Sequence, residues 1–441
     1  MPRLVKPRAR PSKDTLLRQV RRKKRSAEER KRAWWLGGAT GLSVAYIVAS
    51  QALVDLPGWS SLGVLFAIVL AGVLVAGHAF SIWKLRLGKW LWVPAAFMAY
   101  CVLRSFSGVS ESKPWDVILM LVSAFLGGLA VAIALQSGVR FRWLVYAQVA
   151  SNLIQIVIIL FGLGPEPDLG EDTFRYAGIT GNANQLALQL TLGACMIWLL
   201  PRKSGLIPCI FAFLAVGFAL AVTGSRKALL TAFFFFVLAF IQSRDLVPRH
   251  KRRLFYRWAI GGACLLLLVG SPLLYKYGQD VVAVRRTMEF SDDSSYVTRT
   301  EMIQQGLQLW KQSPLFGNGT DAFRGLSGRG TYSHNNYVEL LCDLGIVGVV
   351  LFYALHVQVV VHALRVHRTL KFYCCTFIAM MFLADVGYVS YTSKQAIMIL
   401  MLLMVATTSR YAAKAKPVIV EHRASSSKAF RMRPRRFLMN T

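Results

Sequence analysis

The residues best suited to chemistry lie where a long polar loop meets a long apolar run, beside His334. A helix that begins at Asn335 or Asn336 would carry Glu339 and Asp343 on one face, because these acids are four residues apart. The positive end of the helix dipole disfavours protonation of an adjacent imidazole. His334 would therefore stay neutral and could take a proton from a substrate hydroxyl. The alternative is a structural histidine at the end of a loop.

Small and polar residues flank this helix start. Ser333 is a candidate N-cap, because a serine side chain can accept a hydrogen bond from a free backbone N–H of the first turn. Gly345 and Gly348 lie deeper in the apolar run, where they would let another helix approach closely. Before the histidine, Pro314 and a series of glycines interrupt regular structure, which favours a flexible approach to His334.

Cations stand where a membrane protein tends to avoid them. Arg226 and Lys227 begin a predicted helix on the side opposite the basic tails, where they and exposed N–H groups could bind phosphate. The alternative is that both side chains only extend to the membrane interface. Arg175 precedes a turn rich in glycine and asparagine, but Glu171 and Asp172 could simply pair with it.

One acid lies inside an apolar run. Asp385 falls in the eleventh predicted span, where an ionisable group is costly enough that a function or a specific partner is expected. It is a candidate for substrate binding. The alternatives are a pair with Lys394 or a hydrogen bond to a neighbour.

The composition is that of a membrane protein. Of 441 residues, 55% are hydrophobic and only 17% are charged, below the quarter or so that soluble domains carry. The net charge of +31 lies largely in the two tails and the short loops, as positive-inside sorting predicts, so we expect no nucleic-acid partner. All seven cysteines fall in apolar runs, and no disulfide or metal framework follows.

Apolar run length predicts an all-α polytopic membrane protein with about 12 transmembrane helices, near 34–54, 59–83, 89–105, 115–137, 142–163, 183–201, 205–223, 226–243, 256–277, 336–364, 372–390 and 394–411. An even count places both termini in the cytoplasm and all the basic loops with them. The chain then divides into a basic tail (1–33), spans 1–9 (34–277), a large outer loop with short helices (278–335), spans 10–12 (336–411) and a second basic tail (412–441).

The motif around His334 resembles that of the O-antigen ligase family, which is related to O-antigen polymerases and bacterial protein O-oligosaccharyltransferases. In that family a histidine and an Asn, Ser or Gln are followed by nine residues and then Gly-x-x-Gly, and His334-Asn335 with Gly345 and Gly348 match at each fixed position. Thr223-Gly224-Ser225-Arg226 and Arg175-Tyr176-Ala177-Gly178 resemble its two arginine segments. Arg299 with Pro314 to Gly319 resembles the sequence that precedes its histidine.

The resemblance implies a GT-C-like glycosyltransferase of the bacterial inner membrane that faces the periplasm and needs no metal or other cofactor. Its donor would be a glycan on undecaprenyl pyrophosphate, its acceptor lipid A-core, and its surroundings membrane lipids. His334 would be the catalytic base, and Arg175 and Arg226 would bind the pyrophosphate. The further candidates for substrate binding are Arg299, Lys227, Asn335 and Asp385.

Other functions compete with ligation. An O-antigen polymerase would use the same donor but a second lipid-linked glycan as acceptor. A protein-glycosylating relative is a further alternative. A flippase or transporter for lipid-linked glycans could also bind pyrophosphate with outward arginines, but paired broken helices or repeated halves, which such a fold favours, are not evident in the sequence.

Overall fold

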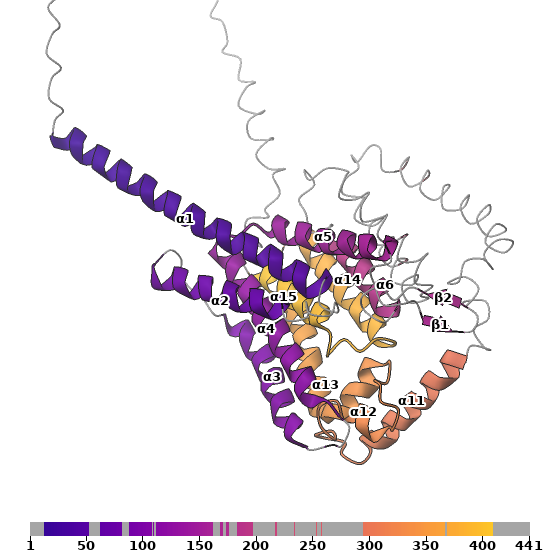
Figure 1. The fold of residues 1–441 in the computed structure, drawn as a ribbon. Coiled ribbons are helices and arrows are strands. Elements are labelled where there is room, and N and C mark those ends of the chain that lie inside the picture. Colours follow the sequence, from indigo (N-terminus) through magenta and orange to yellow (C-terminus); the bar gives the residue numbers. More distant parts are fainter. Residues whose placement is uncertain are drawn as a thin grey trace, which may run out of the picture.

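A computed structural model shows a protein built mainly of helices (Figure 1). It describes residues 13–52, 62–81, 88–107, 109, 112–161, 168–170, 173–175, 183–196, 217, 233, 253, 257, 294–366 and 368–408. Within these residues the expected helical architecture is confirmed apart from one small antiparallel sheet, in which Asp168 is the ladder partner of Arg175.

The elements in chain order are α1 (Lys13–Ala52), α2 (Leu62–Ala79), η1 (Lys89–Leu91), α3 (Trp92–Arg104), η2 (Ser105–Ser107), α4 (Pro114–Ser137), α5 (Phe141–Leu160), β1 (Asp168–Gly170), β2 (Thr173–Arg175), α6 (Ala183–Cys195), α11 (Ser294–Trp310), α12 (Ala322–Leu326), α13 (Asn336–Ala363), α14 (Arg368–Asp385) and α15 (Lys394–Thr408). In Figure 1, α11 and α12 lie at one end of α13, away from α5 and α6.

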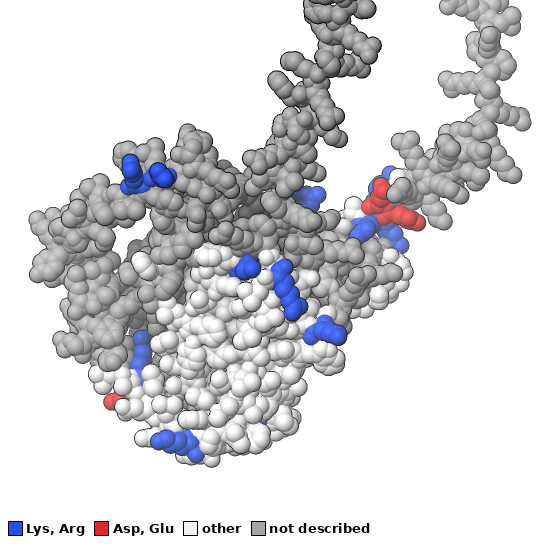
Figure 2. All heavy atoms as spheres, turned by 180° about the vertical axis from the view of Figure 1, so that it is seen from behind, with Lys and Arg blue, Asp and Glu red and all other residues white. Residues whose placement is uncertain are grey.

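Several helices have the length and composition of membrane spans. Within the described residues α2, α4, α5 and α13 are long and apolar enough to cross a bilayer, and α2 turns Leu65 and Ile68 outward, as a helix facing lipid would. Figure 2 shows a face that is largely uncharged, with isolated lysine and arginine side chains. The chain is therefore a membrane protein. The count of twelve spans stays a prediction, and the spans predicted at 205–223, 226–243 and 256–277 lie outside the described residues apart from 217, 233 and 257.

The centre of the bundle is built around α4 and α15, which pack against each other. Pro114 starts α4, where its missing N–H is harmless, and Gly138 ends the helix at a φ of 119°. Gly127 lies under the ring of Tyr46, so that a Cβ would come within 1.8 Å of that ring. The glycine thus allows α1 to pack closely on α4. α15 is buried along most of its length.

A group of buried amides joins α1, α5 and α6. This carboxamide cluster comprises Gln51, Gln148, Asn152, Gln155 and Gln189, each no more than 3% exposed. The amides of Gln155 and Gln189 both donate to the backbone carbonyl of Gln51, at 2.6 and 2.7 Å, which the end of α1 leaves without a helical partner. The side-chain oxygens of the four glutamines have no hydrogen-bond partner within the described part of the chain.

Candidate active site

Asn335 is the N-cap of α13. Its side-chain oxygen accepts hydrogen bonds from the backbone N–H groups of Tyr337 (3.0 Å) and Val338 (3.2 Å). Its amide donates to the carbonyl of Val386 at 3.2 Å. The predicted start of the helix is therefore confirmed, whereas the cap predicted at Ser333 is wrong by two residues. Both ends of the Asn335 carboxamide are engaged within the protein.

His334 precedes this cap in a left-handed backbone conformation, with a φ of 58°. Such a conformation costs a non-glycine residue about 1–3 kcal/mol, and the surrounding structure has to impose it. The buried Ser333 donates its N–H to Glu339 Oε2 at 2.5 Å and its hydroxyl to the Asn335 carbonyl at 2.9 Å. The imidazole is partly exposed and lies 4.4 Å from the ring of Tyr332, measured between centroids. The backbone beside the imidazole is thus fixed, while the ring reaches the surface.

α13 is broken at Gly345, whose φ of 64° and ψ of −167° are not helical. A break leaves backbone groups without helical partners, and the loop over residues 313–320 supplies new ones. Four backbone hydrogen bonds cross between loop and helix: Asn318 N–H to the Cys342 carbonyl (2.9 Å), Gly319 N–H to the Asp343 carbonyl (2.8 Å), Ile346 N–H to the Pro314 carbonyl (3.0 Å) and Val347 N–H to the Leu315 carbonyl (3.1 Å). Protein groups therefore fill the break.

This contact requires glycine on both sides. A Cβ at Gly345 would lie 2.4 Å from the Leu315 carbonyl oxygen, and one at Gly317 would lie 2.3 Å from the Asp343 carbonyl oxygen. The element that approaches Gly345 is thus a loop, not the helix predicted there. The flexible approach predicted after Pro314 is likewise wrong for residues 314–320, because hydrogen bonds fix them against α13.

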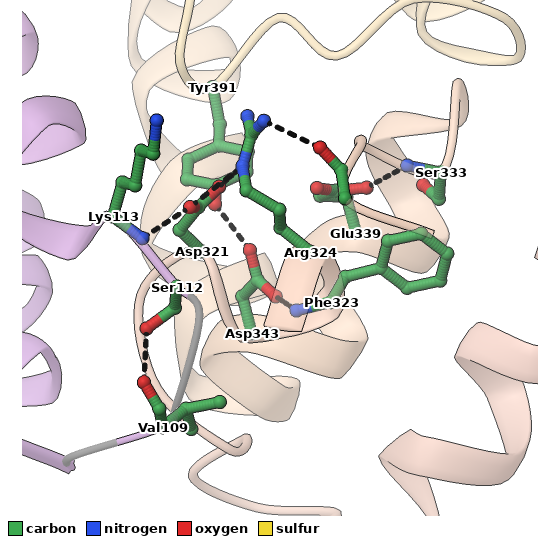
Figure 3. A network of polar contacts seen from close by, with 11 residues as sticks. Val109, Ser112, Lys113, Asp321, Phe323, Arg324, Ser333, Glu339, Asp343 and Tyr391 are labelled. Carbon is green, nitrogen blue, oxygen red and sulfur yellow. Dashed lines mark hydrogen bonds and ion pairs between the residues drawn. The ribbon is translucent and has the colours of Figure 1, made fainter. Parts of the chain in front are cut away.

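The two acids of α13 point into the protein, as expected for one shared face (Figure 3). Asp343 Oδ1 accepts from the Phe323 N–H at 2.8 Å, and Oδ2 accepts from the Tyr391 hydroxyl at 2.5 Å. Burial raises the pKa of Tyr391, and the charge of Asp343 adds to the shift, so the hydroxyl stays protonated and donates. Glu339, as described, holds the Ser333 N–H. Both carboxylates therefore organise the outer segment around the histidine.

A third acid, Asp321, attaches the outer segment to the bundle (Figure 3). Its Oδ2 accepts from the backbone N–H of Lys113 at 2.8 Å, directly before α4. The same carboxylate pairs with Arg324 Nε at 3.0 Å, and Arg324 also donates to the Gly330 carbonyl at 3.1 Å. The loop that leads to His334 is thus attached to the start of α4 through Asp321, and Arg324 holds the residues after α12 close to that attachment.

The buried side chain of Asn336 makes four hydrogen bonds, which is the full capacity of a carboxamide. Its oxygen accepts from the backbone N–H groups of Ser390 and Tyr391, both at 2.9 Å. Its amide donates to the Tyr353 hydroxyl at 3.0 Å and to Asp385 Oδ2 at 3.2 Å. Tyr353 donates to the same Asp385 oxygen at 2.8 Å. Asp385 therefore has specific hydrogen-bond partners, as expected for an acid in an apolar run.

The predicted cations are placed less completely. Arg299 lies on α11, partly buried, and α11 packs against α13. Arg175 ends β2, but its side chain is not among those described. Arg226 and Lys227 lie outside the described residues. In the part of the chain that the structure describes, no group of three His, Cys, Asp or Glu residues is arranged to hold a metal ion.

Sequence reasoning missed three residues of this site: Asn336, Tyr353 and Tyr391. Asn336 carried a weak signal, because it is a second asparagine beside the histidine motif where one cap suffices. The tyrosines carried none, since a tyrosine in an apolar run or an outer turn is ordinary in a membrane protein.

Comparison with protein families identifies part of this chain. A search of curated proteins found no match to this chain. Residues 210–353 match the family model described as O-antigen ligase, a segment that contains His334, its cap and the break at Gly345. The resemblance seen in the histidine motif is thereby confirmed, because the matched segment includes that motif.

Proposed function

We propose that this protein is an O-antigen ligase of the bacterial inner membrane. It transfers a glycan from undecaprenyl pyrophosphate to a sugar hydroxyl of lipid A-core on the periplasmic face, which completes lipopolysaccharide. The observation that carries the proposal is the strained, firmly held His334 within the segment that matches the family. Strain of this kind clusters at sites of chemistry, where the surrounding structure maintains it.

His334 acts as a general base in this proposal. Its imidazole takes the proton from the acceptor hydroxyl as that oxygen forms a bond to the anomeric carbon of the donor. The bond from that carbon to the pyrophosphate oxygen breaks at the same time, and the lipid pyrophosphate leaves with the electron pair. A single displacement inverts the anomeric carbon.

The leaving group explains the need for cations. Negative charge builds on the bridging oxygen as the bond breaks, and a planar guanidinium can match it with two hydrogen bonds. Arg175 and Arg226 have this role in the proposal, with Arg299 and Lys227 as further candidates. Neither the proton transfer nor the departure of pyrophosphate needs a metal ion.

The geometry around His334 supports the role of base. The imidazole precedes the first turn of α13, whose partial positive charge favours the neutral ring. The caps and acids around it bind backbone N–H groups, so the backbone beside the ring is fixed before a substrate arrives. A base held in place avoids reorganisation during the reaction.

The deciding experiment is a lipopolysaccharide gel from a strain that lacks this protein, with the strain carrying the parent gene as control. A ligase predicts that all long chains disappear from lipid A-core while lipid-linked polymer accumulates. Core that carries one repeat unit would instead indicate a polymerase, and unchanged lipopolysaccharide would refute both. Purified protein, donor and lipid A-core should give product at the same rate with and without EDTA.

A further inference from the structure

We propose that Asn336 is a positioning residue for His334, and that it works by locking the start of α13 to the turn between α14 and α15, residues 386–393. The identity of His334 as the base rests on the proposed function. The positioning itself is a statement about structure and can be tested separately.

Several hydrogen bonds join the turn to the first two turns of α13. The joining hydrogen bonds run from the Asn335 amide to the Val386 carbonyl (3.2 Å), from the Ser390 and Tyr391 N–H groups to the Asn336 oxygen (2.9 Å each) and from the Tyr391 hydroxyl to Asp343 (2.5 Å). The segment that carries the histidine therefore takes its position from a turn about fifty residues later in the chain.

Asn336 makes the largest number of side-chain hydrogen bonds in this contact. Its oxygen faces two backbone N–H donors and its amide faces the Asp385 carboxylate and the Tyr353 hydroxyl, so a rotated carboxamide would lose both backbone bonds and the bond to Asp385. His334 stands two positions earlier in a strained conformation. A small rotation of the helix start would move the imidazole, and a displacement near 1 Å can lower a rate about a hundredfold.

Asp385 acts through Asn336 in this arrangement. Its side chain is fully buried, and its Oδ2 accepts from Asn336 and Tyr353. Ser390 is its near neighbour on the turn, and Oδ1 makes no close hydrogen bond of good geometry within the described part. An acid in this place orients Asn336 and does not touch a substrate, which distinguishes it from the substrate-binding residue considered from sequence.

The test compares three variants of the full-length protein in the purified transfer reaction. Asn336→Ala should lower kcat about ten- to a hundredfold, with KM for donor and acceptor changed by no more than about twofold. Asp385→Asn keeps an oxygen for both donors, so its kcat should fall less than that of Asn336→Ala. Tyr353→Phe keeps the ring and should repeat the Asn336→Ala pattern more weakly, which decides the matter if Asn336→Ala fails to fold.

Kinetics can overturn the proposal in two ways. A parental kcat in both Asn336→Ala and Tyr353→Phe would exclude positioning. A large rise in KM for Asp385→Asn would return Asp385 to the substrate-binding residues.

A second measurement does not depend on activity. Diethyl pyrocarbonate acylates neutral imidazole, and its rate at His334 can be followed by mass spectrometry, with the exposed His78 as internal reference. The His334 rate should change several-fold in Asn336→Ala and little in Asp385→Asn. An unchanged rate in Asn336→Ala would contradict the proposal. A changed rate together with full activity of His334→Ala would sink the proposed function and leave the positioning intact.

Discussion

Two buried polar clusters of this protein differ in how completely their hydrogen bonds are made. The Asn336 network comprises Asn336, Asp343, Tyr353, Asp385 and Tyr391. Its central carboxamide uses every donor and acceptor it has, and only Oδ1 of Asp385 lacks a close partner among the described residues of this network. The carboxamide cluster between α1, α5 and α6 is as deeply buried, but each of its glutamines has a side-chain oxygen without a partner in the described part of the chain.

The difference shows what each cluster is suited to do. A fully paired group has one favourable orientation, because any rotation leaves a buried group unsatisfied at a cost of about 1–3 kcal/mol. The Asn336 carboxamide, which is fully paired, can therefore fix the position of a neighbouring catalytic group. A cluster with unpaired acceptors already bears that cost, so it tolerates change and is suited to joining helices.

His334→Ala gives the largest expected effect on activity. The transfer rate should fall by roughly two to four orders of magnitude, the contribution of a general base, while the melting temperature changes little. The parent rate should also fall as the pH is lowered, because a protonated imidazole cannot accept a proton, and the residual rate of His334→Ala should lack this dependence. The control is His362→Ala at the other end of α13. A rate within a few-fold of the parent would falsify the assignment of the base.

Gly345→Ala should give the largest effect on stability, because the network depends on the break. The alanine would be strained by about 1–3 kcal/mol at a φ of 64° and would also collide with the Leu315 carbonyl, at roughly 1–3 kcal/mol more. Gly328→Ala is a control matched in φ, since Gly328 has a φ of 65° and nothing within 4 Å of a new Cβ. Melting temperatures of the purified proteins separate strain from collision. Equal losses would show that the loop is not packed tightly at the break.

Tyr391→Phe should cost about 1–3 kcal/mol, because it leaves Asp343 Oδ2 without its donor. The raised pKa of Tyr391 adds a pH condition. A group whose pKa is raised on folding contributes its full stability below its unfolded value, here 10.0, and loses it only at higher pH. The difference in stability between parent and variant should therefore be constant from neutral to mildly alkaline pH. Tyr146→Phe on α5 is the control.

Gln148→Met should give the smallest effect. Gln148 donates one long hydrogen bond, 3.4 Å to Asn152, and its oxygen has no partner among the described residues. An apolar side chain of similar length removes the unpaired oxygen, so the free energy of unfolding should change by less than about 1 kcal/mol. A loss as large as that of Tyr391→Phe would erase the contrast between the two clusters.

The sequence predicted α4 and α13 well, because their signals are local, whereas α1 begins at Lys13, inside the stretch expected to be a basic tail. The apolar run at 336–364 corresponds to α13 at Asn336–Ala363, and the run at 115–137 corresponds to α4, which a proline and a glycine delimit. The histidine motif placed the candidate base, since fixed spacing of a few residue types is visible without a structure.

Tertiary contacts decided what the sequence could not show. Gly345 in an apolar run is typical of close helix packing, and its actual partner is a loop some thirty residues earlier. Ser333 and Asn335 are both good cap residues, and the added bond from Asn335 to Val386 lies in a distant turn. The hydrogen-bond partners of Asp385 could not be predicted for the same reason, because one of them, Asn336, is 49 positions away in the sequence.

The break at Gly345 also bears on how far the start of α13 lies from the hydrocarbon layer of the membrane. α13 has 28 residues and would measure about 42 Å, more than the roughly 30 Å of a hydrocarbon layer. The part after the break, residues 346–363, measures about 27 Å and matches one layer by itself. The nine residues before the break, 336–344, would then lie outside the hydrocarbon layer. In the proposed reaction, His334 would there meet a sugar that projects from the membrane, while the lipid anchors of the donor and acceptor stay in the bilayer.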